Sequence, residues 1–162
     1  MNINSLINHI EGSWLIQTTI YDLSTCKLKN KKQQVLCQQV NKNSKQLKVF
    51  KNRIGKSHTQ LQLYSLKYGL NTASKETYLL FFFEKSLDQG SITKYTYDNK
   101  IISDYVFFIR NNNHIHIKSA HRNFHTTEDI YFINSKFKIA KSTISKNNKC
   151  ITVCFSSKIK MN

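Results

Sequence analysis

The chain has 162 residues, of which 25 are Lys or Arg and nine are Asp or Glu, giving a formal net charge of +16. That length suffices for a domain with its own apolar core, and a hydrophobic content of 40% is typical of a globular rather than a disordered chain. The longest apolar run, residues 79–83, falls far short of the roughly 18 residues that a transmembrane helix needs. We therefore expect a single domain over residues 1–162 with no membrane partner.

Alternating apolar and polar residues dominate the chain from its beginning to its end. An amphipathic helix is predicted over residues 3–10 and the first strand over residues 14–23. The lysine-rich stretch 27–34 is predicted to be a solvated hairpin or the start of a strand. Turn residues separate the strands, as at positions 147 and 148. The remaining predicted strands are residues 33–40, 46–52, 59–68, 76–85, 91–98, 104–110, 114–120, 126–133, 136–145 and 149–160.

Short strands at spacings of about ten residues are typical of an antiparallel sheet that closes into a barrel. Closure removes exposed strand edges, which would be an aggregation hazard in a chain with so many aromatic strands. A barrel of eight or more strands leaves an interior able to hold one small ligand. The sequence therefore predicts an all-β fold: an antiparallel, lipocalin-like β-barrel of about ten strands with a short N-terminal helix.

The basic charge has a compositional origin. Only three of the 25 basic residues are Arg, the chain contains no Pro and four Gly, and Lys, Asn and Ile have AT-rich codons. We interpret this as the imprint of an AT-rich genome such as that of an organelle. Basic charge usually suggests nucleic-acid binding, but a compositional origin of the charge weakens that inference here. We expect no nucleic-acid partner, and a weak, salt-sensitive nucleic-acid binder stays open as the lesser alternative.

The cysteines and histidines do not form a recognisable metal motif. Cys150 and Cys154 are close in sequence, but the other two cysteines do not form a matching pair of the kind that zinc sites show. Four histidines lie between positions 114 and 125, and the first two are spaced so that they share a strand face, as metal ligands can. The Glu and the Gly-bearing turn of a cupin-like metal site are missing. We expect free thiols, exposed histidines and no metal.

Both ends of the chain resemble the S-type (CpcS/CpeS) phycobiliprotein chromophore lyases, which handle linear tetrapyrroles. That family has an early segment close to W-x-S-Q-R-T, a later one close to E-x-x-W-F-x-x-P-N-L-R-L-R-x-S, and a final one close to F-S-S-E-I-R. All three occur here in that order. The matching residues are Trp14, Gln17, Thr19, Glu128, Phe132, Ser142, Phe155, Ser156, Ser157, Ile159 and Lys160.

The departures from the family pattern concern mostly charged positions. Thr18 and Ala140 stand where the family has Arg, and Lys138 stands where it has another Arg. Tyr131 replaces Trp, and Lys158 replaces Glu, which reverses the charge. The chain thus resembles a divergent member. A non-catalytic carrier of a bilin or another apolar ligand is the alternative to a lyase.

The resemblance implies a barrel that binds a phycoerythrobilin-type bilin as substrate, with no permanently bound cofactor. The bilin would be attached or delivered to a cysteine of an apo-phycobiliprotein subunit, with a bilin reductase as a further partner. It also implies a plastid (chloroplast) location in the stroma and a monomer or homodimer. Glu128 is implied as the catalytic residue. The implied bilin-binding residues are Trp14, Gln17, Thr18, Phe83, Glu84, Tyr131, Phe132, Lys138, Ser142 and Lys158.

Whether Glu128 and Lys138 face the same way depends on the turn near Asn134. Residues two apart in a strand share a face, so Glu128 lies with Phe132, and Lys138 with Ser142. An odd-residue loop or a bulge would bring both pairs to the ligand side, whereas an even loop would not. A shared face would let a carboxylate meet pyrrole N–H groups and an ammonium meet a propionate. The alternative is that Glu128 is a surface charge and the lysines form a solvated face.

Overall fold

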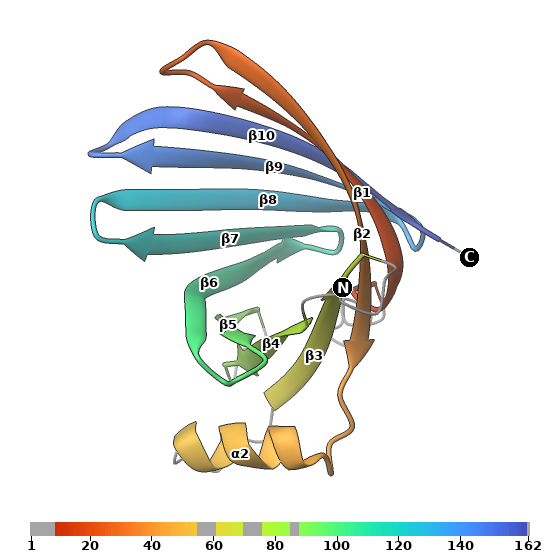
Figure 1. Cartoon of the computed structure of the whole chain (residues 1–162). Helices are drawn as coiled ribbons and strands as arrows, with labels where there is room; N and C mark the ends of the chain where they lie inside the picture. The colour runs from red at the N-terminus through yellow and green to blue at the C-terminus, as the bar shows by residue number, and fades with distance from the viewer. Residues whose placement is uncertain (1–8, 55–60, 70–75, 85–87, 162) are drawn as a thin grey trace.

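The computed structural model describes residues 9–54, 61–69, 76–84 and 88–161 (Figure 1). These residues form ten strands in one closed antiparallel barrel, in which neighbours in sequence are neighbours in the sheet and β1 pairs with β10. The predicted ten-stranded barrel is confirmed. The elements are β1 (Gly12–Asp22), β2 (Lys27–Gln39), α2 (Lys45–Ile54), β3 (Leu61–Tyr68), β4 (Glu76–Phe83), β5 (Gln89–Thr96), β6 (Ile101–Asn111), β7 (His114–His121), β8 (Phe124–Asn134), β9 (Phe137–Lys146) and β10 (Lys149–Lys160).

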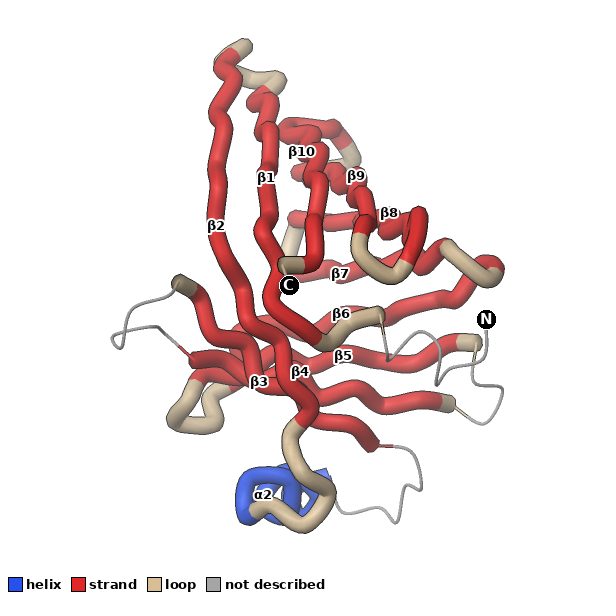
Figure 2. Tube along the Cα trace, turned by 90° about the vertical axis from the view of Figure 1, so that its right-hand side faces the viewer, coloured by secondary structure: helices blue, strands red, loops and turns tan. Residues whose placement is uncertain are grey.

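β1 and β2 form a long hairpin whose tip stands beyond the other strands (Figure 2). β2 starts at Lys27, six residues before the predicted start at residue 33, so the lysine-rich stretch is the beginning of a strand. Its first residues are all exposed, and they pair only with β1, since the pairing of β2 with β3 begins at Val35. We call the projecting part of this hairpin, residues 21–32, the arm.

Residues 46–52 lie in α2, so their prediction as a strand is wrong. Ser44 caps the helix: its Oγ accepts a hydrogen bond from the backbone N–H of Leu47 at 3.2 Å. Leu47 and Phe50 are three residues apart, share one helical face and are 2% and 0% exposed. Val49, which alternates with Leu47 in a strand-like way, is instead 41% exposed. Burial of one helical face therefore overrode a short period-two pattern.

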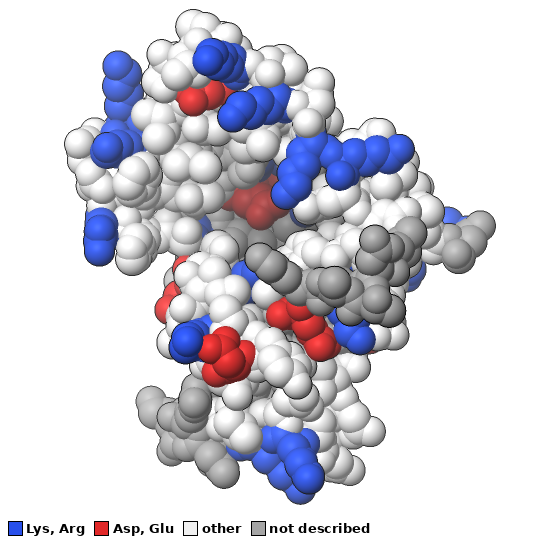
Figure 3. Space-filling view, viewed as in Figure 1, with Lys and Arg blue, Asp and Glu red and all other residues white. Residues whose placement is uncertain are grey.

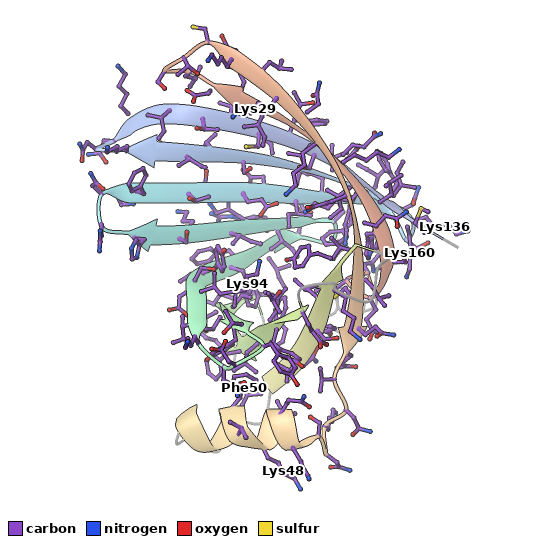
Figure 4. All side chains as sticks on the ribbon, in the orientation of Figure 1. Lys29, Lys48, Phe50, Lys94, Lys136 and Lys160 are labelled. Atoms are coloured by element: carbon purple, nitrogen blue, oxygen red, sulfur yellow. The ribbon has the colours of Figure 1, made fainter. Side chains whose placement is uncertain are left out.

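Buried side chains of the described residues form two clusters, one inside the barrel and one under α2. In β4 the odd positions, such as Phe81, point into the barrel, and the even ones, such as Leu80, point towards α2. Phe50 lies between α2 and the strands, whereas Lys48 projects from the far side of the helix (Figure 4). α2 thus covers part of the outer wall and leaves the barrel interior to other side chains.

We expect Leu47→Ala to lower the free energy of unfolding by about 2–3 kcal/mol, because it removes a fully buried side chain and leaves a cavity under α2. Denaturant unfolding measures the change. Val49→Ala on the same helix is the control and should change the free energy by less than about 0.5 kcal/mol. Equal effects of the two substitutions would contradict the packing of α2.

His9 and Ile10 pack at one end of the barrel. The predicted helix over residues 3–10 lies outside the described residues, apart from His9 and Ile10, which form a turn. The Ile10 carbonyl accepts a hydrogen bond from Trp14 Nε1 at 3.0 Å. The His9 ring meets the Phe132 ring edge-on, with centroids 5.8 Å apart. Within the described part of the chain, no helix is long and apolar enough to cross a membrane.

Candidate ligand-binding cavity

A cavity of about 350 Å³ lies inside the barrel, and all ten strands contribute to its wall. The wall is mainly apolar and includes the aromatic residues Phe81, Tyr105, Phe107 and Phe132. A hollow opens in the face shown in Figure 3, with acidic atoms at its bottom. A concave apolar site with a few polar groups is typical of a small-molecule pocket. The charged residues among those described in the wall are Lys94, Glu128, Lys138 and Lys158.

A bulge decides that Glu128 and Lys138 share the inner face. Glu128 pairs with Ser142 and Phe132 pairs with Lys138, and the register then shifts between Phe132 and Asn134. The extra residue in β8 compensates for the two-residue turn, so the even positions of β8 and β9 both point inward. Of the two arrangements left open by the sequence, the structure therefore has the one in which a bulge brings Glu128 and Lys138 to the same face.

Lys138 is the most unusual charged residue of the cavity, because it is only 9% exposed. Its Nζ lies 3.6 Å from the centroid of the Trp14 ring and donates a hydrogen bond to the His9 carbonyl at 3.3 Å. Burial, and secondly the positive charge of Lys158, lower the pKa of Lys138 to about 7. The ammonium group therefore exchanges its proton near neutral pH.

Glu128 and Lys158 form a partly buried ion pair. Lys158 Nζ lies 3.5 Å from Glu128 Oε1, and their side chains are 18% and 33% exposed respectively. At that distance and exposure the pair is weak, since solvent screens it. Lys158 also stands directly opposite Lys138 across β9 and β10. The carboxylate is therefore available to a ligand, and two ammonium groups flank it.

The structure places the other predicted residues of the inner face around this centre. Thr18 and Ser156 share a hydroxyl–hydroxyl hydrogen bond of 2.8 Å. Ser142 stands between Glu128 and Cys154 in the sheet. Phe83 is buried in the aromatic cluster of the barrel. Of the predicted residues, five line the cavity itself: Trp14, Glu128, Phe132, Lys138 and Lys158.

Three predicted bilin-binding residues do not face the barrel interior. Gln17 is exposed and follows Ile16, which lines the cavity, so the pleat of β1 points it outward. Tyr131 faces outward for the same reason and stacks on the His114 ring, with centroids 4.4 Å apart. Glu84 lies beyond the end of β4, is exposed, and accepts a hydrogen bond from the Gln89 side chain.

Lys94 is a cavity residue that the sequence interpretation missed. Its Nζ donates a hydrogen bond to Tyr68 Oη at 3.1 Å and lies 5.3 Å from the centroid of the same ring. Figure 4 shows Lys94 within the space that the strands enclose. The sequence feature that could have identified Lys94 is its position two residues after Ile92, because residues two apart in a strand share one face.

Cys37 is a second wall residue that was not predicted from the sequence. Burial raises the pKa of its thiol to about 12, so the thiol stays protonated.

Two of the four histidines, His114 and His116, cluster around Asp129 on the outer wall and are partly buried, so the expectation of exposed histidines is wrong for these two. His114 Nε2 and His116 Nδ1 lie 2.8 and 2.7 Å from the same oxygen, Asp129 Oδ1. Burial of Asp129 acts to raise its pKa, but the hydrogen bonds with the two histidines outweigh this and lower it. In the described ranges, no three His, Cys, Asp or Glu side chains are grouped so as to hold a metal ion.

Comparison with known proteins places the chain in a family. The family model for CpeS-like proteins matches residues 2–161. The chain belongs to the CpeS-like family. A chromophore lyase CpcS/CpeS homolog from Gracilaria tenuistipitata var. liui is 26% identical over 161 residues, which make up 99% of each chain.

Solved structures share the fold of this CpeS-like chain. The S-type phycobiliprotein lyase CPES from Guillardia theta matches with a TM-score of 0.76 at 13% identity, covering 100% of this chain and 94% of that one. A DUF3598-family protein of unknown function from Nostoc punctiforme matches with a TM-score of 0.57 at 9% identity. That match covers 99% of this chain and 49% of the Nostoc chain.

The three segments that carry the sequence resemblance are neighbours in the CpeS-like barrel. They fall on β1, on the β8–β9 hairpin and on β10, which are four consecutive strands of the closed sheet. Segments from both ends of the chain thus form one continuous wall, and Trp14, Glu128, Lys138 and Lys158 all project from it into the cavity.

Proposed function

We propose that this CpeS-like protein is a phycobiliprotein chromophore lyase that binds a bilin, of phycoerythrobilin type, in the barrel cavity. It then attaches or delivers the bilin to a cysteine of an apo-phycobiliprotein subunit. The observation that carries the proposal is a partly buried carboxylate beside ammonium groups in an apolar, aromatic cavity. Membership of the family, and the description of the Gracilaria relative as a chromophore lyase homolog, support it.

The chemistry of the cavity suits an open-chain tetrapyrrole. The apolar wall matches the long conjugated system of such a pigment. The described lining residues include three lysines against one glutamate, a net charge of +2 when all are ionised, which complements two propionates. Glu128 accepts hydrogen bonds from pyrrole N–H groups in this arrangement, and Lys138 and Lys158 contact a propionate each.

The reaction needs little covalent chemistry from the protein. The acceptor thiol adds across a vinyl-type double bond of the bilin: its sulfur bonds to one carbon, the thiol proton is lost, and a proton enters the conjugated system. No group leaves. Glu128 polarises or protonates the pigment, and the barrel holds it in one orientation for the incoming thiol. Proximity and orientation supply most of the rate under these conditions.

A non-catalytic bilin carrier is the second candidate. Ala140 is 3% exposed on the inner face and offers no cation where the family has Arg, and Thr18 is likewise uncharged. Lysine gives charge without the two-pronged geometry of Arg, so it orients a propionate less firmly. A pigment held in several orientations would reach the acceptor thiol productively only part of the time.

Absorbance titration with phycoerythrobilin tests the proposal. We expect micromolar protein to red-shift and sharpen the visible band of the pigment, and an unchanged spectrum would refute bilin binding. Transfer to an apo-subunit, seen as zinc-induced fluorescence on a denaturing gel, separates lyase from carrier. Competition by a fatty acid would instead indicate a general carrier of apolar ligands.

We also propose that the protein acts in the plastid stroma, because its composition carries the imprint of an AT-rich organelle genome. The enzyme that supplies its substrate is then a bilin reductase in the same compartment. Its acceptor is the apo-subunit that needs the pigment.

A further inference from the structure

The two ends of the barrel differ. At one end His9 and Ile10 pack on Phe132 and Trp14. The opposite end carries the turns between β1 and β2, β5 and β6, β7 and β8, and β9 and β10. Glu128 lies four residues along β8 from Phe132 towards that opposite end, roughly 13 Å at about 3.3 Å per residue. We call the opposite end the mouth rim, formed by residues 21–32, 97–102, 121–125 and 146–150.

The mouth rim exposes large apolar side chains. Six of them lie on two of its hairpins, with exposed fractions from 38% to 70%. Exposed apolar side chains that gather on one part of a surface, and are interspersed with polar ones, are typical of protein–protein interfaces. These six side chains are Tyr21, Leu23, Leu28, Tyr97, Ile101 and Ile102.

The mouth rim is also strongly basic. Its four segments contain eight Lys or Arg against two Asp, a net charge of +6. Both acids are occupied locally: Asp22 accepts hydrogen bonds from Ser24 and Thr25, and Asp98 pairs with Lys100. Across the described ranges, none of the four arm lysines takes part in an ion pair. Lys29 on the arm is labelled in Figure 4.

We propose that the mouth rim is the docking surface for the acceptor subunit, and that it recognises an acidic surface with apolar residues next to the acceptor cysteine. The inference rests on the proposed function. His9 and Ile10 pack against the cavity wall at the other end, so we place the meeting of pigment and acceptor thiol at the mouth rim, the end towards which Glu128 lies. The unpaired lysines call for an anionic partner. Exposed aliphatic side chains such as Leu28 and Ile101 beside these lysines favour a protein as the partner, because such apolar patches are typical of protein–protein interfaces. The exposed rings of Tyr21 and Tyr97 make single-stranded nucleic acid the alternative that the test must separate.

The test compares two triple charge reversals in the full-length protein. Lys27→Glu/Lys29→Glu/Lys149→Glu changes the mouth rim, and Lys42→Glu/Lys45→Glu/Lys48→Glu makes the same charge change near α2. Each protein is titrated with phycoerythrobilin, and the loaded protein is then bound to immobilised apo-phycobiliprotein α and β subunits at several salt concentrations.

Both variants should bind phycoerythrobilin with the wild-type Kd to within twofold. The rim variant should bind the apo-subunit at least tenfold more weakly at low salt, and the α2 variant less than twofold more weakly. Wild-type affinity should fall steeply with salt, and the rim variant should show a shallower fall.

Three results would overturn the docking proposal: wild-type affinity of the rim variant, equal losses in both variants, or no binding of the loaded wild-type protein to either subunit. Each protein is also titrated with a single-stranded RNA probe. If the rim variant loses binding to the RNA and keeps binding to the apo-subunit, the rim is assigned to nucleic acid instead. Failure of the wild-type protein to bind phycoerythrobilin is a separate result, because it refutes the proposed function itself.

Discussion

Glu128→Gln should slow covalent transfer of the bilin by about 100-fold or more, because a positioned proton donor or acceptor contributes about 10²–10⁴ to a rate. Gln keeps the size of the side chain and a hydrogen-bonding oxygen, but it can neither carry the negative charge nor exchange a proton. The apolar wall and the lysines are unchanged, so the pigment should still bind, with a smaller red shift. Stopped-flow absorbance measures binding, and zinc-induced fluorescence of the denatured acceptor measures transfer.

The neighbouring residue provides a matched control. Asp129 is an acid one position along β8, but it points to the outer wall, where it bonds His114 and His116. Asp129→Asn should therefore change the transfer rate by less than twofold. Wild-type transfer by Glu128→Gln, or equal losses in the two variants, would remove Glu128 from the mechanism.

Lys138→Met should stabilise the protein without bilin at pH 6 by about 2–4 kcal/mol, because it removes a buried charge whose pKa has fallen from 10.5 to about 7. Below pH 7 both the folded and the unfolded chain hold this proton, so the cost of burying the charge is complete. Between pH 7 and 10.5 the unfolded chain binds the proton more tightly, and the stability of the wild-type protein rises with pH. The advantage of the variant should therefore shrink as the pH rises from 7 towards 10.

Denaturant unfolding at pH 6 and pH 9 measures this effect. Lys141 is exposed on the outer face of the same strand, so Lys141→Met is the control and should have little effect at either pH. A Lys138→Met protein less stable than the wild type at pH 6 would show that the Trp14 ring and the His9 carbonyl more than offset the cost of burial.

The same lysine should make bilin binding depend on pH. Losing the charge-assisted hydrogen bond to a propionate costs about 1.5–3 kcal/mol, which is roughly a 10- to 100-fold weaker Kd for Lys138→Met at pH 6. Wild-type affinity should fall between pH 6 and 9 as Lys138 loses its proton, whereas Lys138→Arg should keep its affinity across that range. Identical pH profiles for the two proteins would assign the propionate contact to another cation.

The fold was predictable because its signal is local. Period-two alternation repeated over most of the chain, with turn residues between the strands, is sufficient to predict an antiparallel all-β barrel. The α2 segment shows the limit of that signal. Leu47 and Val49 alternate like strand residues, whereas Leu47 and Phe50 have the spacing of one helical face. A segment of seven residues is too short to distinguish the strand pattern from the helix pattern. Ser44 as an N-cap was the cue that favoured the helix.

The sequence by itself determined ten of the eleven predicted strands, and it indicated that Trp14, Glu128 and Lys138 belong to one ligand-binding wall. Only the tertiary structure decided which side chains meet, because neighbouring strand residues point in opposite directions and a one-residue shift exchanges inside for outside. The bulge after Phe132 brings Glu128 and Lys138 to one face, while the pleat turns Gln17 and Tyr131 outward. Barrel closure adds Lys94 from the opposite wall, and the barrel interior, not the sequence, sets the low pKa of Lys138.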